Sequence, residues 1–169
     1  MQKAIFLDRD GVINIDHAYV SKIEDFEFCK GVFEALKHFQ SLGYLLIVVT
    51  NQSGIGRGYY TEEDFETLSS WMCQEFLYNN IKIDAIYHCP HSPEAHCECR
   101  KPKSGMFKEA ISAFDIDVKD SWMIGDKSSD IEAAQGVNIG NTIFLGEAQN
   151  SGAKYCVNFL LDTIDLIKN

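Results

Sequence analysis

The sequence has few prolines, no long hydrophobic run and fewer basic than acidic residues. Its 3 prolines, 46% hydrophobic and 24% charged residues are typical of a globular chain, which excludes a largely disordered or fibrous protein. The longest apolar run, residues 45–49, is far shorter than the roughly 20 residues of a membrane-spanning helix. The amino-terminal run reaches Asp8 too soon to be the core of a secretion signal. We therefore expect a cytoplasmic protein without a membrane partner.

The shortage of basic residues also limits the possible partners. Fifteen lysines and arginines against 25 aspartates and glutamates give a formal net charge of −10. Such a surface repels nucleic acid, so nucleic acid is not an expected partner. A length of 169 residues suits a single domain, which we expect to span residues 1–169 and to act as a monomer.

Three of the six cysteines lie within eleven residues that also contain histidines. In a reducing compartment such clustering favours a metal site over disulfides. The pattern Cys-x-His followed by Cys-x-Cys supplies the four ligands of a closed tetrahedral zinc site: Cys89, His91, Cys97 and Cys99. His96 is an alternative to His91. Because protein atoms would fill all four positions, we expect a structural Zn²⁺ that shapes a small zinc-binding loop at about residues 89–102.

Short apolar runs alternate with segments of helical periodicity along the chain. The runs predict strands at residues 4–7, 44–49, 85–88, 122–124, 142–145 and 155–157. The periodic segments predict helices at residues 31–41, 61–78, 105–114, 128–135 and 160–167. This alternation is typical of an α/β fold, a Rossmann-like three-layer αβα sandwich with a mainly parallel sheet. The segments between the strands are too short for a large cap domain.

Acidic side chains follow two of the predicted strands at the point where each strand ends. Asp8 and Asp10 follow the first strand, and Asp126 follows the fourth. Because ligands of such sheets bind at the carboxyl ends of the strands, we expect these three residues to meet. Neighbouring carboxylates repel one another unless a cation neutralises them, and oxygen ligands suit Mg²⁺. The sequence therefore predicts a catalytic magnesium site.

The other strand ends carry groups that bind anions. They are Thr50, Asn51, Gln52, Ser53, Arg100 and Lys101. Together with magnesium, these groups predict phosphoryl transfer. A carboxylate can itself attack phosphorus to form an aspartyl-phosphate, which divides one difficult displacement into two easier steps.

Four segments contain the polar groups of the predicted site. They are Asp8-Arg9-Asp10-Gly11-Val12-Ile13-Asn14, Val48-Val49-Thr50-Asn51-Gln52-Ser53-Gly54-Ile55-Gly56-Arg57-Gly58, Cys99-Arg100-Lys101-Pro102 with Gly105-Met106, and Ile124-Gly125-Asp126-Lys127 with Asp130. In this order the segments resemble the motifs of the haloacid dehalogenase superfamily. More narrowly, they are similar to those of its small histidinol-phosphate and D-glycero-D-manno-heptose-bisphosphate phosphatases. The resemblance covers about residues 4–145.

The resemblance implies a role for each polar group of the site. Asp8 would be the nucleophile, and Asp10 would protonate the leaving alkoxide and then activate water. Thr50 and Lys101 would stabilise the transferring phosphoryl group. Mg²⁺ would bind the Asp8 carboxylate, the backbone carbonyl of Asp10 and Asp126.

Two nearby residues leave alternatives open. Lys103 is a rival to Lys101, because it lies only two positions further along the chain. Asp130 would either form a salt bridge with Lys101 or serve only as a helix-turn residue without a part in catalysis.

The segment after Asp10 corresponds to a substrate-contacting flap in the resembling phosphatases. The expected substrate-binding residues are Asp16, His17, Ala18, Tyr19, Asn51, Gln52, Ser53, Arg100 and Lys127. Arg100 is suited to a second phosphate group, since its guanidinium binds phosphate through two parallel hydrogen bonds. A bisphosphate substrate favours D-glycero-D-manno-heptose 1,7-bisphosphate, from which the family is expected to remove the C7 phosphate.

Other functions compete with this interpretation. A histidinol-phosphate phosphatase would use the same motifs. A nucleic-acid-end phosphatase or a zinc-stabilised binding module would need a basic groove, which a net charge of −10 disfavours. A signalling module could store phosphate on Asp8, but it would have no use for a general acid at Asp10.

Overall fold

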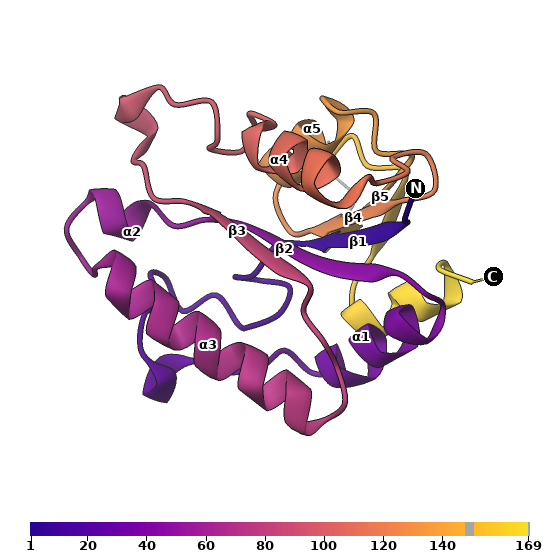
Figure 1. Cartoon of the computed structure of the whole chain (residues 1–169), viewed down its shortest axis with the longest axis horizontal. Coiled ribbons are helices and arrows are strands. Elements are labelled where there is room, and N and C mark those ends of the chain that lie inside the picture. Colours follow the sequence, from indigo (N-terminus) through magenta and orange to yellow (C-terminus); the bar gives the residue numbers. More distant parts are fainter. Residues whose placement is uncertain (148–150, 169) are drawn as a thin grey trace.

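The computed structural model describes residues 1–147 and 151–168, which form a six-stranded sheet covered by helices on both faces (Figure 1). The strands are β1 (Ala4–Leu7), β2 (Leu45–Asn51), β3 (Ala85–Cys89), β4 (Trp122–Gly125), β5 (Asn141–Leu145) and β6 (Tyr155–Val157). Their order in the sheet is β3-β2-β1-β4-β5-β6, and each neighbouring pair is parallel. The predicted Rossmann-like αβα fold is therefore confirmed.

The helices lie in two layers. They are α1 (Val32–Ser41), α2 (Ser53–Gly56), α3 (Glu62–Tyr78), α4 (Gly105–Phe114) and α5 (Ser128–Gln135), with three 3-10 helices η1 (Ile23–Asp25), η2 (Pro93–Ala95) and η3 (Leu160–Asp165). Figure 1 shows α4 and α5 above the sheet and α1 and α3 below it.

The alternation of side chains along each strand divides the core into two parts. In β1, Ile5 and Leu7 face the layer of α1 and α3, whereas Ala4 and Phe6 face α4 and α5. All four side chains are fully buried. This explains why β1 is a continuous apolar run, since a central parallel strand is buried on both faces.

Local signals place the helix starts close to their predicted positions. Thr61 caps α3, because its hydroxyl accepts from the Asp64 backbone N–H while the Asp64 carboxylate accepts from the Thr61 N–H. Gly31 precedes α1 with a φ of 81°, and a Cβ there would lie 2.3 Å from the Leu161 side chain. A glycine is therefore needed at that position.

The structure shifts the bounds of one predicted strand and changes the type of one predicted helix. The strand predicted at residues 44–49 begins at Leu45 and continues to Asn51, because Thr50 and Asn51 still pair with β3. The glycine-bearing segment that follows forms the short helix α2. The last predicted helix is instead the 3-10 helix η3.

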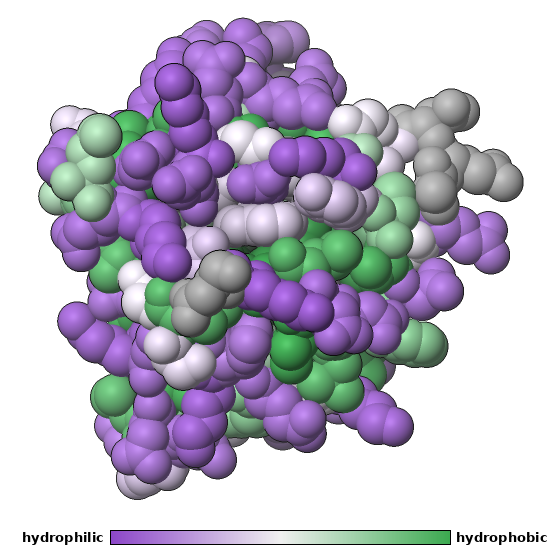
Figure 2. Space-filling view, turned by 90° about the vertical axis from the view of Figure 1, so that its right-hand side faces the viewer, coloured by the Kyte–Doolittle hydropathy of each residue, from purple (hydrophilic) through white to green (hydrophobic). Residues whose placement is uncertain are grey.

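The carboxyl ends of β1 to β4 meet at one edge of the sheet, because all these strands are parallel and adjacent. None of the helices formed by the described residues has the length and apolar character to cross a membrane. Figure 2 shows that hydrophilic side chains cover most of the face on the right of Figure 1, with apolar side chains gathered near its middle.

Candidate active site

A buried ion pair lies at the carboxyl end of β1. Asp8 directly follows β1, and the Lys101 ammonium reaches it from the loop after β3 at 2.9 Å. The same ammonium lies 2.6 Å from the Asp130 carboxylate and donates to the Val49 carbonyl at 2.7 Å. Asp8, Lys101 and Asp130 are 5%, 3% and 1% exposed. Asp130 thus forms a salt bridge with Lys101, which resolves the alternative that the sequence left open.

Burial and neighbouring charges set the proton affinities in this cluster. Burial raises the pKa of Asp8 well above its usual value, and the negative charge of Asp130 adds to the rise while Lys101 opposes it. Burial by itself would lower the pKa of Lys101, but the charges of Asp130 and Asp8 outweigh burial and raise it. Lys101 therefore stays protonated and can face a negatively charged phosphoryl group.

The acidic cluster has the donor set of a magnesium site. Carboxylate oxygens of Asp8, Asp126 and Asp130 lie within 4.8 Å of one another. Oδ1 of Asp126 is buried and has no hydrogen-bond partner among the described residues. Gly11 leaves room for this carboxylate, since a Cβ there would lie 2.0 Å from Asp126 Oδ2. An unpartnered buried oxygen beside other carboxylates fits a hard cation such as Mg²⁺.

The Asp10 carboxylate is not part of that cluster and is held by three donors. Its Oδ1 accepts from Arg9 Nη2 at 2.9 Å and from Asn14 Nδ2 at 3.0 Å. Its Oδ2 accepts from Gln52 Nε2 at 3.1 Å. Arg9 is 2% exposed and also donates to the Val20 carbonyl at 2.8 Å. Asp10 is therefore connected both to the segment after β1 and to the end of β2.

The residues at the end of β2 hold other parts of the site in place. The Asn51 side chain accepts from the Lys101 backbone N–H at 3.0 Å and donates to the Lys101 carbonyl at 3.1 Å. Gln52 Nε2 donates to the Thr50 hydroxyl at 2.8 Å. Asn51 therefore connects the Lys101 loop to β2, and Gln52 orients Thr50.

A cavity of about 610 Å³ opens over the ion pair. Its lining includes all but one of the expected substrate-binding residues: Asp16, Ala18, Tyr19, Asn51, Gln52, Ser53, Arg100 and Lys127. His17 is the exception, because it pairs with Glu27 at 2.9 Å and lines a neighbouring hollow. Lys127 lies 3.6 Å from Asp16 across the cavity. Nη1 of Arg100 is buried without a hydrogen-bond partner in the described part of the chain.

Sequence reasoning gave no role to several residues that contact the site, among them Pro93 and Ser129 in the cavity lining. Arg9 and Asn14 hold Asp10, and Tyr60 lines the cavity. Arg9 and Asn14 are within the first motif, which is the signal that could have found them. Tyr60 has no such signal, because it lies beyond the second motif and contacts the site only through the fold.

The predicted zinc ligands come together in the loop after β3. Sγ of Cys89 lies 3.5 Å from Cys97 Sγ and 2.9 Å from Cys99 Sγ, and His91 Nδ1 lies 3.3 Å from Cys99 Sγ. A tetrahedral site with Zn–S bonds of about 2.3 Å would separate its sulfurs by about 3.8 Å. The Cys89–Cys97 and Cys99–Cys97 sulfur distances of 3.5 and 3.6 Å are close to this value, and the Cys89–Cys99 distance is shorter.

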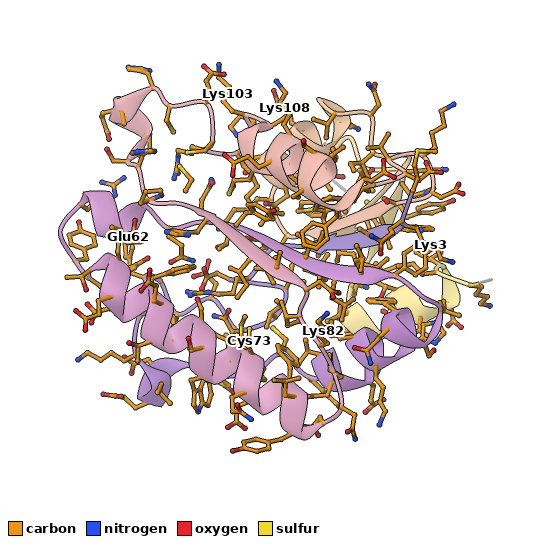
Figure 3. All side chains as sticks on the ribbon, viewed as in Figure 1. Lys3, Glu62, Cys73, Lys82, Lys103 and Lys108 are labelled. Carbon is orange, nitrogen blue, oxygen red and sulfur yellow. The ribbon has the colours of Figure 1, made fainter. Side chains whose placement is uncertain are left out.

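The structure distinguishes Lys101 from its alternative Lys103, and His91 from its alternative His96. The Lys103 side chain is 59% exposed, lies 3.5 Å from Glu98 and stands at the outside of the molecule in Figure 3. Lys101 rather than Lys103 therefore faces Asp8. The sulfur-rich cluster contains His91 and not His96.

Comparisons with known proteins agree with this geometry. The HAD-hydrolase-like family model matches residues 98–151. A D-glycero-alpha-D-manno-heptose-1,7-bisphosphate 7-phosphatase of Campylobacter jejuni is 55% identical over 89% of this chain and 86% of its own length. A D-glycero-beta-D-manno-heptose-1,7-bisphosphate 7-phosphatase of Pasteurella multocida is 45% identical over 97% of this chain and 94% of its own length.

A solved structure shares the fold of this chain. The D,D-heptose 1,7-bisphosphate phosphatase of B. bronchiseptica, complexed with magnesium and phosphate, superimposes with a TM-score of 0.87 and 25% identity, covering 97% of each chain. Both the fold and the predicted resemblance are thereby confirmed. The chain therefore belongs to the haloacid dehalogenase superfamily, in the family of the D-glycero-D-manno-heptose-1,7-bisphosphate 7-phosphatases.

Proposed function

We propose that this protein is a Mg²⁺-dependent phosphatase that removes the C7 phosphate of D-glycero-D-manno-heptose 1,7-bisphosphate. The observation that carries the proposal is the buried Asp8 carboxylate, held at 2.9 Å by Lys101 at the floor of an open cavity. Relatives with 55% and 45% identity are named for this reaction, which favours it over a histidinol-phosphate, nucleic-acid or storage role.

The proposed chemistry begins at Asp8. One carboxylate oxygen attacks phosphorus, a new O–P bond forms, and the bond from phosphorus to the sugar C7 oxygen breaks with its electron pair on that oxygen. A protonated Asp10 gives its proton to the departing oxygen. Asp10, now ionised, takes a proton from water, which attacks phosphorus and releases inorganic phosphate and free Asp8.

Other side chains bind and orient the phosphoryl group. Lys101 faces the negative oxygens, and the buried Thr50 hydroxyl, oriented by Gln52, donates to one of them. Mg²⁺, bound by Asp8, Asp126 and the backbone carbonyl of Asp10, would add positive charge to neutralise these oxygens.

Substrate recognition would use the rim of the cavity. Arg100 and Lys127 both line the cavity, and the Arg100 guanidinium would bind the second phosphate. Asp16, which lies 3.6 Å from Lys127, and Tyr19 also line the cavity and would contact sugar hydroxyls. His17 remains a predicted contact although it lies outside this cavity.

We also propose a structural role for Zn²⁺ in the loop after β3. The four ligands Cys89, His91, Cys97 and Cys99 leave no position for a catalytic water. Gly105 lets this loop pack closely, because a Cβ there would lie 2.5 Å from the Glu98 carbonyl oxygen. Zinc would therefore fix the loop that carries Lys101. A reducing cytoplasm would keep the cysteine thiols free to bind zinc.

We still predict that the protein is a monomer.

A substrate panel tests the proposal. Phosphate release from both anomers of heptose 1,7-bisphosphate, histidinol phosphate and fructose bisphosphate should rank the heptose substrates first by kcat/KM. Asp8→Asn should abolish turnover, whereas Asp120→Asn, at an exposed position, should not. Isotopic phosphate trapped on any residue other than Asp8 would contradict the mechanism, and a preference for histidinol phosphate would contradict the substrate.

A further inference from the structure

A buried tyrosine lies behind the proposed general acid. The Tyr60 hydroxyl donates to Gln52 Oε1, and Gln52 Nε2 in turn donates to Asp10 Oδ2 at 3.1 Å and to the Thr50 hydroxyl at 2.8 Å. Tyr60 is 7% exposed and Gln52 is 2% exposed. A short chain of hydrogen bonds therefore runs from the loop before α3 to Asp10.

This chain determines which way the Gln52 amide points. An amide has one acceptor oxygen and one donor nitrogen, and only the nitrogen can donate to a carboxylate. Because Tyr60 donates to the oxygen, the nitrogen is left facing Asp10 and Thr50. Burial raises the pKa of Tyr60 to about 12, so the hydroxyl keeps its proton at neutral pH.

The backbone is built to admit the tyrosine ring. Gly54 lies two residues after Gln52, and a Cβ there would lie 2.2 Å from Tyr60 Cε1. The ring therefore packs directly on the turn that carries Gln52. A core aromatic without a polar role would need this packing but not the hydroxyl.

We propose that Tyr60 is a positioning residue that acts through Gln52 to hold Asp10 in the orientation needed for proton transfer. The inference rests on the proposed role of Asp10 as general acid. Asp10 is also held by Arg9 and Asn14 on its other oxygen, so loss of the tyrosine hydroxyl should weaken its positioning without releasing it.

The test separates proton transfer from general damage to the site. A general acid matters most for a poor leaving group such as a sugar alkoxide, and little for nitrophenolate. In single-turnover measurements, Tyr60→Phe should slow phosphoryl transfer from heptose 1,7-bisphosphate about 3- to 10-fold, as expected for one lost hydrogen bond. Transfer from p-nitrophenyl phosphate should change less than about 2-fold.

A double-mutant cycle tests the path. If Tyr60 acts through Gln52, adding Tyr60→Phe to Gln52→Leu should cause no further loss. Tyr78→Phe, at the exposed end of α3, is the matched control and should behave as the wild type. Thermal melting of each variant reports whether it folds.

The outcomes are distinct. If Tyr60→Phe slows transfer from heptose 1,7-bisphosphate and from p-nitrophenyl phosphate equally, the inference is wrong, because a general disturbance of the cavity would have that effect. The inference is also wrong if the losses of rate in Tyr60→Phe and Gln52→Leu are additive. If Asp10→Asn slows phosphoryl transfer but Tyr60→Phe does not, the positioning role of Tyr60 is wrong and the proposed role of Asp10 still stands. A wild-type rate in Asp10→Asn would overturn the proposed role of Asp10 and the inference with it.

Discussion

Replacement of Asp130 by asparagine tests how much the salt bridge with Asp130 contributes to holding Lys101 in place. The carboxylate of Asp130 has two partners: the Lys101 ammonium at 2.6 Å from Oδ1 and the Lys127 backbone N–H at 3.1 Å from Oδ2. Asparagine has the same shape but only one acceptor oxygen. Asp130→Asn must therefore lose one of these two contacts.

The size of the effect follows from this geometry. A hydrogen bond that involves a charged group contributes about 1.5–3 kcal/mol, and the site is too buried for water to replace it. Lys101 keeps Asp8 and the Val49 carbonyl, so the loss should be smaller than for an isolated buried charge. At about 2–4 °C per kcal/mol for a domain of this size, Tm should fall by about 3–12 °C.

Calorimetry in saturating Mg²⁺ is the suitable assay, because the metal suppresses repulsion among the remaining carboxylates. We also expect kcat to fall about 10-fold or more, since Lys101 is less well oriented. Asp162→Asn is a matched control: Asp162 accepts from the Phe159 N–H at 3.2 Å at the start of η3 but is exposed. It should lose little stability and no activity.

Two results would contradict the proposed role of Asp130 in holding Lys101. Wild-type Tm and kcat in Asp130→Asn would mean that the salt bridge with Lys101 does not position the lysine. Equal losses in the variant and in the Asp162→Asn control would mean that the lost helix-start contact, and not the salt bridge, accounts for the effect.

Further measurements test the metals and the substrate. Arg100→Ala should raise KM for a bisphosphate at least about 10-fold and have little effect on KM for a monophosphate, because only the bisphosphate has a second anionic group. Equal changes in KM for the two substrates would show that Arg100 does not bind the second phosphate. Cys97→Ser should lower the zinc content measured by mass spectrometry and reduce kcat, whereas Cys156→Ser should retain zinc; full zinc in the first variant would contradict the site. Burial, followed by the charge of a neighbouring carboxylate, raises the pKa of Asp8 and Asp126, so the folded metal-free protein binds protons more tightly than the unfolded chain. The stability that these two groups contribute is therefore fully present below the unfolded pKa of about 4 and is lost as pH rises through the folded values. Calorimetry in EDTA should show this loss as pH rises above about 4, less steeply in Asp126→Asn, and Mg²⁺ should restore more Tm at high pH than at low pH. No difference between the variant and the wild type would contradict the linkage.

Local sequence patterns were enough to predict the helices and strands and the chemistry at their ends. Apolar runs and helical periodicity are local patterns, so they predicted six strands whose parallel order brings Asp8, Lys101 and Asp126 to one edge. The spacing of cysteines and histidine predicted a cluster that the fold assembles. Thr61 likewise marked the start of α3, because a capping side chain acts within four residues.

The contacts between polar groups of the site follow from tertiary packing and not from local sequence patterns. Gln52 and Asp10 are 42 positions apart, and no local pattern shows that they touch or that Tyr60 lies behind them. The burial of Arg9 depends on the Val20 carbonyl lying within reach, and the position of His17 outside the main cavity depends on its contact with Glu27. Such contacts are set by how segments pack in space, since hydrogen bonds depend on distance and direction and not on separation along the chain.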